Sequence, residues 1–294
     1  MADADWWRYK QVRGEPLPES AELLGARYRL ERVLKRDFYA AVGVYVRDEP
    51  ADGEGDPSPA RVLYKVYHTD GVGLNAPPWR WLGRMLRNRE AHYFTLLDGI
   101  PGVPRLWAVQ GESALVREYV PGRNLREFVR DGQTPDAAYF PRLRQTLDAV
   151  HARGVSHNDL SKPENLLVTD EGAPVLIDFQ IAARTIGQGW PVLGRLSRAV
   201  IRYVQRVDRY HLAKQHRRRR PDEFDAKERE NLRRKGLLLS LHGRFVRRPY
   251  RAVRHVVLDR YLTRADGPTA PAAPHVGLAP ETSAQRETGV GQGR

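Results

Sequence analysis

Cysteine is absent from the 294-residue chain, which excludes a disulfide framework, a thiolate metal site and a cysteine nucleophile. The chain also has no run of about 18 apolar residues, the length expected of a membrane-spanning helix. Its first residues, MADADWWRYK, do not have the basic and then apolar pattern of a signal peptide. We therefore expect a cytoplasmic location. Two alternatives stay open: a soluble protein, and a protein attached peripherally to the inner face of the membrane.

Acidic residues are scarce in one part of the chain. Residues 184–264 contain 23 Arg and Lys but only 7 Asp and Glu, a net charge of +16, whereas the whole chain carries +13. The other residues therefore sum to −3. A charge-balanced portion followed by a basic one indicates an anionic partner, such as lipid headgroups, nucleic acid or a phosphorylated substrate. An ordinary solvated surface would also account for this charge.

The most informative segment is residues 151–182, HARGVSHNDLSKPENLLVTDEGAPVLIDFQIA. A His-Asn-Asp triplet ends at Asp159 and is followed six residues later by Asn165, and an apolar stretch at 173–177 leads into Asp178. Two carboxylates and an amide supply oxygen ligands, which suit a hard cation such as Mg²⁺. Their order and spacing indicate phosphoryl transfer from Mg-ATP, with one carboxylate for the acceptor hydroxyl and the other groups for the metal.

These motifs resemble the protein-kinase-like superfamily and, within it, a small bacterial branch similar to RIO kinases and lipopolysaccharide-core sugar kinases. The resemblance covers roughly residues 25–215. Ordinary protein kinases place the Asn one residue closer to the catalytic Asp, and they have Gly where this chain has Gln180. In the bacterial branch, the longer spacing and an IDFQ strand occur together.

The resemblance implies an α+β, bilobal protein-kinase-like fold, with a mostly β small lobe, a helical large lobe and a basic helical C-terminal extension. The lobes implied by the resemblance are a small lobe at 21–118 and a large lobe at 119–215. Composition adds a flexible arm at 1–20, a basic extension at 216–264 and a disordered tail at 265–294.

The resemblance also implies roles for individual residues. Asp159 would orient the acceptor hydroxyl and accept its proton, and Lys65 would grip the α- and β-phosphates of ATP. Asn165 and Asp178 would be the ligands of Mg²⁺. Lys162 lies where related kinases carry a phosphate-contacting Lys.

Two strands around a short turn are predicted at residues 28–47, because apolar and polar residues alternate there. A kinase fold would place its phosphate-covering hairpin here, but the segment has no G-x-G-x-x-G pattern. Lys35, near the turn, is a candidate for binding the phosphates instead. A plain surface hairpin is the alternative.

A buried ion pair is predicted between Lys65, in a strand at 60–67, and Glu90, in a helix at 79–97. Helical spacing places Glu90 on the same face as Leu86 and Tyr93, and a buried carboxylate needs a cation nearby. The alternatives are an edge-strand Lys that extends to water and a Glu on the surface.

Backbone contacts with adenine are implied for the segment from Glu118 to Val120, on topology alone. Helices are predicted at 125–129 and 137–152, the second capped by Gly154 in the left-handed conformation. The His-Asn-Asp triplet should then lie on a loop. There His157 is expected to brace the loop rather than react, and Phe179 to lie in the core.

An amphipathic helix is predicted at 193–210, and we favour its packing on the large lobe with a solvated Arg face. Its predicted apolar stripe is Leu196, Val200, Tyr203, Val207 and Tyr210, and its Arg face is Arg195, Arg198, Arg202, Arg206 and Arg209. A further basic and apolar stretch follows at 241–262. Docking of the segment 193–262 on an anionic membrane surface is favoured over nucleic acid, because large apolar residues recur with helical spacing.

The sequence therefore predicts a kinase that transfers the γ-phosphoryl group of ATP to a hydroxyl, with ATP and Mg²⁺ as cofactors. The acceptor, a protein Ser or Thr or a sugar of an envelope glycolipid, stays open. The alternative is a nucleotide-binding pseudokinase adaptor that docks on membrane or RNA through its basic helices.

Overall fold

The structure is a computed structural model, and it describes residues 16–36, 40–48, 58–67, 77–185 and 190–223. Most of the predicted arm lies outside these residues, as do the stretch at 241–262 and the tail. No helix in the described part of the chain combines the length and the hydrophobicity needed to cross a membrane.

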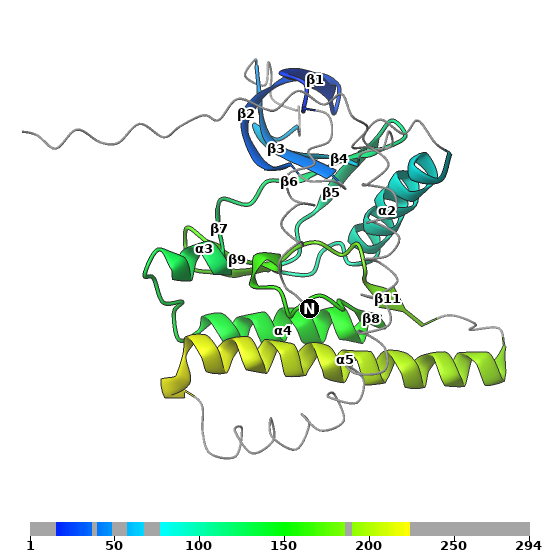
Figure 1. Ribbon diagram of the computed structural model, residues 1–294, viewed down its shortest axis with the longest axis vertical. Helices are drawn as coiled ribbons and strands as arrows, with labels where there is room; N and C mark the ends of the chain where they lie inside the picture. The colour runs from blue at the N-terminus through cyan, green and yellow to red at the C-terminus, as the bar shows by residue number, and fades with distance from the viewer. Residues whose placement is uncertain (1–15, 37–39, 49–57, 68–76, 186–189, 224–294) are drawn as a thin grey trace, which may run out of the picture. The chain divides into compact units, whose positions relative to one another are not determined.

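A six-stranded antiparallel sheet forms the first lobe (Figure 1). Its order is β1-β2-β3-β4-β6-β5, and the strands are β1 (Ser20–Leu23), β2 (Ala26–Arg36), β3 (Ala40–Arg47), β4 (Arg61–Tyr67), β5 (Leu106–Gln110) and β6 (Ala114–Glu118). The strands β2 and β3 confirm the predicted strand pair. One face of the sheet holds a cluster that includes Tyr28, Tyr45 and Val116. The hydroxyl groups of both tyrosines form hydrogen bonds: Tyr28 Oη donates to Pro59 O, and Tyr45 Oη donates to Pro18 O.

The helix α2 (Pro77–Leu96) contacts β4, β5 and β6 of this sheet. Tyr93 and Phe94, in its last turn, and Leu97, just after it, are buried, and so is Glu90 one turn earlier. The predicted helix and the buried position of Glu90 are therefore confirmed.

The second lobe is built mainly from helices (Figure 1). Its helices are α3 (Leu125–Arg130), α4 (Tyr139–Ala152) and α5 (Pro191–Arg219), with the 3-10 turns η1 (Pro163–Asn165) and η2 (Pro221–Glu223). Its short strands are β7 (Gly122–Asn124), β8 (Val155–Ser156), β9 (Leu166–Thr169), β10 (Pro174–Leu176) and β11 (Ala183–Arg184). They form a three-stranded sheet, β10-β9-β7, and a two-stranded sheet, β11-β8. The core of this lobe includes Phe140, Leu143, Leu147, Leu166 and Phe179.

Two glycines have backbone requirements that explain their positions. Gly154 ends α4 with a φ of 72°, as predicted for a left-handed cap, and its N–H donates to His151 O. Gly122 starts β7 with a φ of 142°, and a Cβ there would lie 2.3 Å from Val168 O. A side chain at residue 122 would therefore force β7 and β9 apart.

The helix predicted at 193–210 is confirmed within α5, but its predicted buried face is wrong in the first turns, and its other members, Tyr203, Val207 and Tyr210, are only half-buried. Leu196 and Val200 are 62% and 51% exposed, whereas the buried face includes Ile201, Gln205 and Asp208. The buried face of α5 was not predicted because it includes two polar side chains, Gln205 and Asp208. A search for apolar periodicity does not detect polar residues that are buried. The five predicted Arg positions are exposed, so the solvated Arg face is confirmed.

Candidate active site

The loop between β8 and η1 carries Asp159 into the site. Its carboxylate is 12% exposed, and its Oδ2 accepts hydrogen bonds from Lys162 Nζ at 2.6 Å and from Asn165 Nδ2 at 3.0 Å. Asn165 Nδ2 also donates to Asp159 O at 3.1 Å. The predicted residues Asp159, Lys162 and Asn165 therefore lie together. Because the amide nitrogen of Asn165 is engaged, its amide oxygen is the group left for a ligand.

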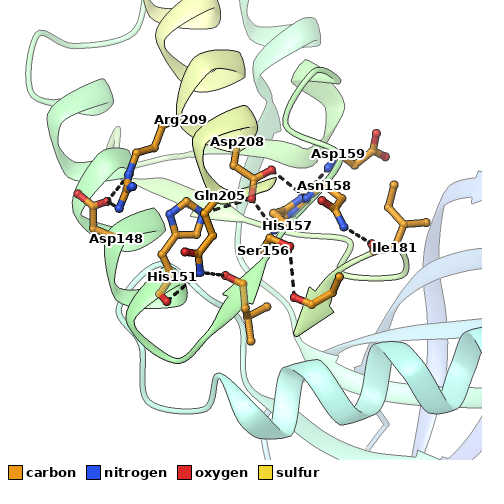
Figure 2. Close-up of polar contacts among 12 residues, drawn as sticks. Asp148, His151, Ser156, His157, Asn158, Asp159, Ile181, Gln205, Asp208 and Arg209 are labelled. Carbon is orange, nitrogen blue, oxygen red and sulfur yellow. Dashed lines mark hydrogen bonds and ion pairs between the residues drawn. The ribbon is translucent and has the colours of Figure 1, made fainter. Parts of the chain in front are cut away.

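This loop is held by Asp208 of α5, which was not predicted from the sequence (Figure 2). The carboxylate of Asp208 is buried and accepts hydrogen bonds from the backbone N–H of His157 at 2.7 Å and of Asn158 at 2.9 Å. His151 Nε2 lies 3.2 Å from the same carboxylate. One signal could have found it, since Asp208 is the first acidic residue after Asp178 in a strongly basic segment.

A second polar side chain of α5 strengthens this attachment. Gln205 is buried, and its Nε2 donates to His151 O and to Val155 O, each at 3.0 Å (Figure 2). Together with Asp208, it joins α5 to the end of α4 and to the start of the loop. The position of Asp159 is thus set by a helix about 50 residues further along the chain.

His157 is engaged on every side, in agreement with the structural role predicted for it. Its Nε2 donates to Ile177 O at 3.0 Å, and its Nδ1 accepts from the N–H of Asp159 at 3.3 Å. Its ring packs 4.7 Å from the ring of Phe179, which is buried as predicted. His157 therefore ties the loop to the segment that carries Asp178.

Two residues of the site other than glycine, Asn158 and Asp178, have the same φ of 68°. This left-handed conformation is uncommon outside glycine, although Asn and Asp adopt it more readily than other residues. Asn158 is stabilised by the bond from its Nδ2 to Ile181 O at 2.9 Å. The left-handed backbone conformation at both positions would be strained for most other residue types.

Asp178 follows Ile177, the residue after β10, and its carboxylate lies beside Lys65. Lys65 Nζ lies 3.8 Å from its Oδ1, and this oxygen accepts no hydrogen bond from the described residues. Burial opposes ionisation of the carboxyl group, but Lys65, Lys35, His157 and Lys162 together outweigh it and hold the pKa of Asp178 below its usual value. An ionised carboxylate with a buried oxygen that lacks a donor fits a magnesium ligand.

Lys65 and Glu90 form the predicted buried pair. Lys65 Nζ lies 2.7 Å from Glu90 Oε2, and the two side chains are 8% and 1% exposed. Tyr67 Oη donates to the same oxygen. Burial raises the pKa of Glu90 although Lys65 acts to lower it, and the nearby Asp178 raises it further. The alternative of a Lys at a sheet edge is wrong, because β4 lies between β3 and β6.

The segment after Asp178 is attached to the first lobe by direct bonds. Gln180 Nε2 donates to Tyr67 Oη at 3.0 Å, and Tyr67 in turn contacts Glu90. From α2, Arg89 donates to Gln180 O and to Ala182 O. Gln180, which replaces the Gly of ordinary protein kinases, thus links this segment to the buried pair through its side chain.

The remaining predicted site residues lie around these groups. Lys35 lies near the end of β2, paired with Val42 in the ladder, and its charge acts on Asp178. Glu118 ends β6 and exchanges bonds with Arg105, because its N–H donates to Arg105 O and its carboxylate accepts from Arg105 N. Val120 lies between β6 and β7, in the connection between the two sheets. The nucleotide-binding roles of Lys35, Glu118 and Val120 stay predictions.

Besides Lys65, the site contains a second buried cation, Arg117 of β6, which was not predicted from the sequence. It is 6% exposed, and its guanidinium carbon lies 5.6 Å from the ring centroid of Phe94. Burial lowers the pKa of Arg117, and Glu90 and Asp178 oppose that effect. Its Nε has no acceptor among the described residues. The acids of the site therefore face cations from two neighbouring strands.

The arrangement suits transfer of a phosphoryl group. The Oδ2 atom of Asp159 accepts hydrogen bonds from Lys162 and Asn165, so its Oδ1 atom can accept a hydrogen bond from a hydroxyl. Asp178 and Asn165 offer oxygen ligands to a cation, and Lys65 offers a positive charge beside them.

Comparison with known proteins identifies relatives among Ser/Thr protein kinases. No family model matches the chain. The chain is 42% identical over 177 residues to CBL-interacting serine/threonine-protein kinase 16 of Arabidopsis thaliana, a match that covers 58% of this chain and 34% of that protein. It is 32% identical over 173 residues to CBL-interacting serine/threonine-protein kinase 5 of the same plant, with 57% and 36% covered.

A bacterial relative supports the same relationship. Serine/threonine-protein kinase C of Synechocystis is 28% identical over 174 residues, with 56% of this chain and 31% of that protein covered. The chain thus spans about a third of the length of the curated relatives it matches. These relatives support the protein-kinase-like superfamily, and with the curled sheet and helical lobe they agree with a bilobal kinase-like α+β fold.

Proposed function

We propose that the chain is an ATP-dependent kinase that transfers the γ-phosphoryl group to the hydroxyl of a protein Ser or Thr. One observation carries the proposal: Asp178, with a buried oxygen that lacks a donor, lies 3.8 Å from Lys65, which is itself paired with Glu90. This geometry combines an oxygen ligand with a cation for phosphates. The relatives, named as Ser/Thr protein kinases, support the choice of acceptor.

In the proposed reaction, Asp159 accepts a hydrogen bond from the acceptor hydroxyl and orients its oxygen toward the γ-phosphorus. The new P–O bond forms as the bond to the β-γ bridging oxygen breaks, and the hydroxyl proton passes to Asp159 while ADP leaves. Lys65 would contact the α- and β-phosphates, with Lys35 and Lys162 as further cations. Mg²⁺ held by Asp178 and Asn165 would neutralise charge on the phosphates.

We further propose that the chain lies within a branch similar to RIO kinases and lipopolysaccharide-core kinases. The six-residue spacing from Asp159 to Asn165 and the presence of Gln180 support this placement. Such a branch leaves a sugar hydroxyl of an envelope glycolipid as the alternative acceptor. The pseudokinase adaptor is disfavoured, because Lys65, Asp159 and Asp178 keep side chains with the chemistry that transfer requires.

The test compares the wild-type chain with Asp159→Asn, using γ-labelled ATP and Mg²⁺. A Ser/Thr-containing protein fraction and extracted envelope lipid are offered as separate acceptors. We expect labelled protein with the wild type and a loss of about 10²–10⁴-fold with Asp159→Asn, since general-base catalysis contributes that much. The matched control is Asp148→Asn, at an exposed ion pair with Arg209, which should transfer at the wild-type rate (Figure 2).

Each outcome decides between the alternatives. Label in the lipid fraction alone would reject the protein acceptor and favour the sugar acceptor. Bound ATP without label in either fraction would favour the adaptor. Full transfer by Asp159→Asn would reject the role assigned to that residue.

A further inference from the structure

The first turns of α5 expose apolar side chains to solvent. Leu196 and Val200 are 62% and 51% exposed, and Val192 is 80% exposed. Leu193 is 44% exposed, and Trp190, just before the helix, is 74% exposed. In Figure 1 these turns run past the end of α4, which lies beside the rest of the helix. Large apolar side chains gathered in this way call for an explanation.

The exposed apolar side chains lie along one face of α5, which differs from the face buried against the lobe. Val192, Leu196 and Val200 are spaced four residues apart, so they share one face of the helix. The buried residues Ile201 and Asp208 lie on another face, which packs against the lobe. The apolar stripe of α5, defined as Val192, Leu193, Leu196 and Val200, is therefore distinct from the face that folding requires.

The charge around the apolar stripe has one sign. Arg195, Arg198, Arg202 and Arg206 are all exposed on the same helix. Residues 179–207 contain no Asp or Glu, so the segment brings no acid of its own to pair with them. A partner of this surface must therefore be anionic and must also accept aliphatic side chains.

We propose that this end of α5 docks on an anionic lipid surface, with the apolar stripe at the level of the acyl chains and the arginines at the headgroups. Aliphatic side chains bordered by Arg are the pattern of helices that lie in a membrane interface. Trp190 at the start of the helix suits the same interface, where its ring has an apolar body and a polar N–H. Single-stranded nucleic acid would instead require aromatic side chains for stacking along the surface, and the apolar stripe is aliphatic.

The test measures partition of the full chain onto vesicles, without nucleotide, so its result is independent of the proposed kinase activity. Vesicles of equimolar phosphatidylcholine and phosphatidylglycerol are compared with vesicles of phosphatidylcholine alone. We expect binding to the anionic vesicles, and a loss of about tenfold or more in the double variant Leu196→Gln/Val200→Gln. Arg195→Gln and Arg198→Gln should each lower the partition coefficient about fivefold.

Two controls keep the measurement specific to α5. Val109→Gln removes an apolar side chain that is 43% exposed on β5, outside the proposed surface, and should bind as the wild type does. Brominated lipid should quench part of the tryptophan fluorescence of the wild type, and that part should be missing in Trp190→Phe. Basic residues elsewhere in the chain could attract vesicles but would not reproduce this quenching.

Three results would overturn the proposal. Equal binding by Leu196→Gln/Val200→Gln would assign lipid binding to another part of the chain. Failure to bind vesicles, together with concentration-dependent dimerisation that the double variant abolishes, would identify the apolar stripe as a contact between copies of the chain. If the wild-type chain does not bind vesicles but binds RNA, the surface is identified as a nucleic-acid surface.

Discussion

Replacing Lys65 by Met should reveal how the buried pair stabilises the protein. In the wild type Lys65 Nζ lies 2.7 Å from Glu90 Oε2, and both side chains are almost fully buried. Removal of one partner of a buried pair costs about 3–5 kcal/mol, since the other charge is left without compensation. Tyr67 still donates to Glu90, and the carboxyl group can take up a proton, so we expect a loss of about 3 kcal/mol in the free energy of unfolding at neutral pH.

The sign of the pH dependence follows from the pKa of Glu90. Burial already raises that pKa, and removal of Lys65, which acts to lower it, raises it further. A carboxyl group whose pKa is higher in the folded state favours folding at low pH, and the folded protein loses stability as pH rises through that pKa. Lys65→Met should therefore be less destabilised near about pH 5 than near about pH 8.

Urea unfolding of four chains measures these effects: wild type, Lys65→Met, Glu90→Gln and the double variant. The double variant should recover most of the loss seen in Lys65→Met, because it also removes the ionisable carboxyl group of Glu90. Arg61→Met is the matched control, at an exposed pair with Glu31 at 3.0 Å, and should cost no more than about 1 kcal/mol. A loss in Lys65→Met that is the same at both pH values, with no recovery in the double variant, would refute the reasoning.

The other predictions concern Asp178 and Asp208. Asp178→Asn should raise the Mg²⁺ concentration needed for half-maximal transfer, measured by titration at saturating ATP, and an unchanged requirement would exclude Asp178 as a ligand. The pKa of Asp178 lies below its usual value, so its contribution to stability is present above about pH 4 and disappears as pH falls through the lowered pKa. Urea unfolding of wild type and Asp178→Asn should accordingly converge on acidification, and a constant difference would contradict this. Asp208→Ala leaves the buried N–H of His157 and the partly buried N–H of Asn158 without acceptors, at up to about 1–3 kcal/mol each, and should unfold at lower urea concentration and lose transfer. Wild-type stability would show that the loop does not depend on α5.

Local spacing in the sequence was sufficient to predict much of the site. The strand that carries Lys65 and the helix that carries Glu90 follow from periodicity, and a charge on a buried face requires an opposite charge nearby. The loop with Asp159 and Asn165 follows from a motif contained in a few residues. In each of these cases the pattern that specifies the structure is short.

The features that were missed depend on contacts between distant parts of the chain. Asp208 and Gln205 are buried because they satisfy backbone groups about 50 residues earlier, which no local pattern in α5 reveals. Arg117 was missed because a strand pattern treats a buried cation as a surface position. In α5, periodicity correctly predicted an amphipathic helix but could not determine which face packs against the lobe.

The helix α5 is continuous over 29 residues and carries features of two kinds. With a rise of about 1.5 Å per residue, Leu196 and Asp208 are separated by about 18 Å along its axis. If lipid binds the first turns, the rigid helix fixes the height and the tilt of the loop that carries Asp159 above the surface. An acceptor confined to the same surface would then be searched for in two dimensions, at a high effective concentration, without any conformational change in the protein.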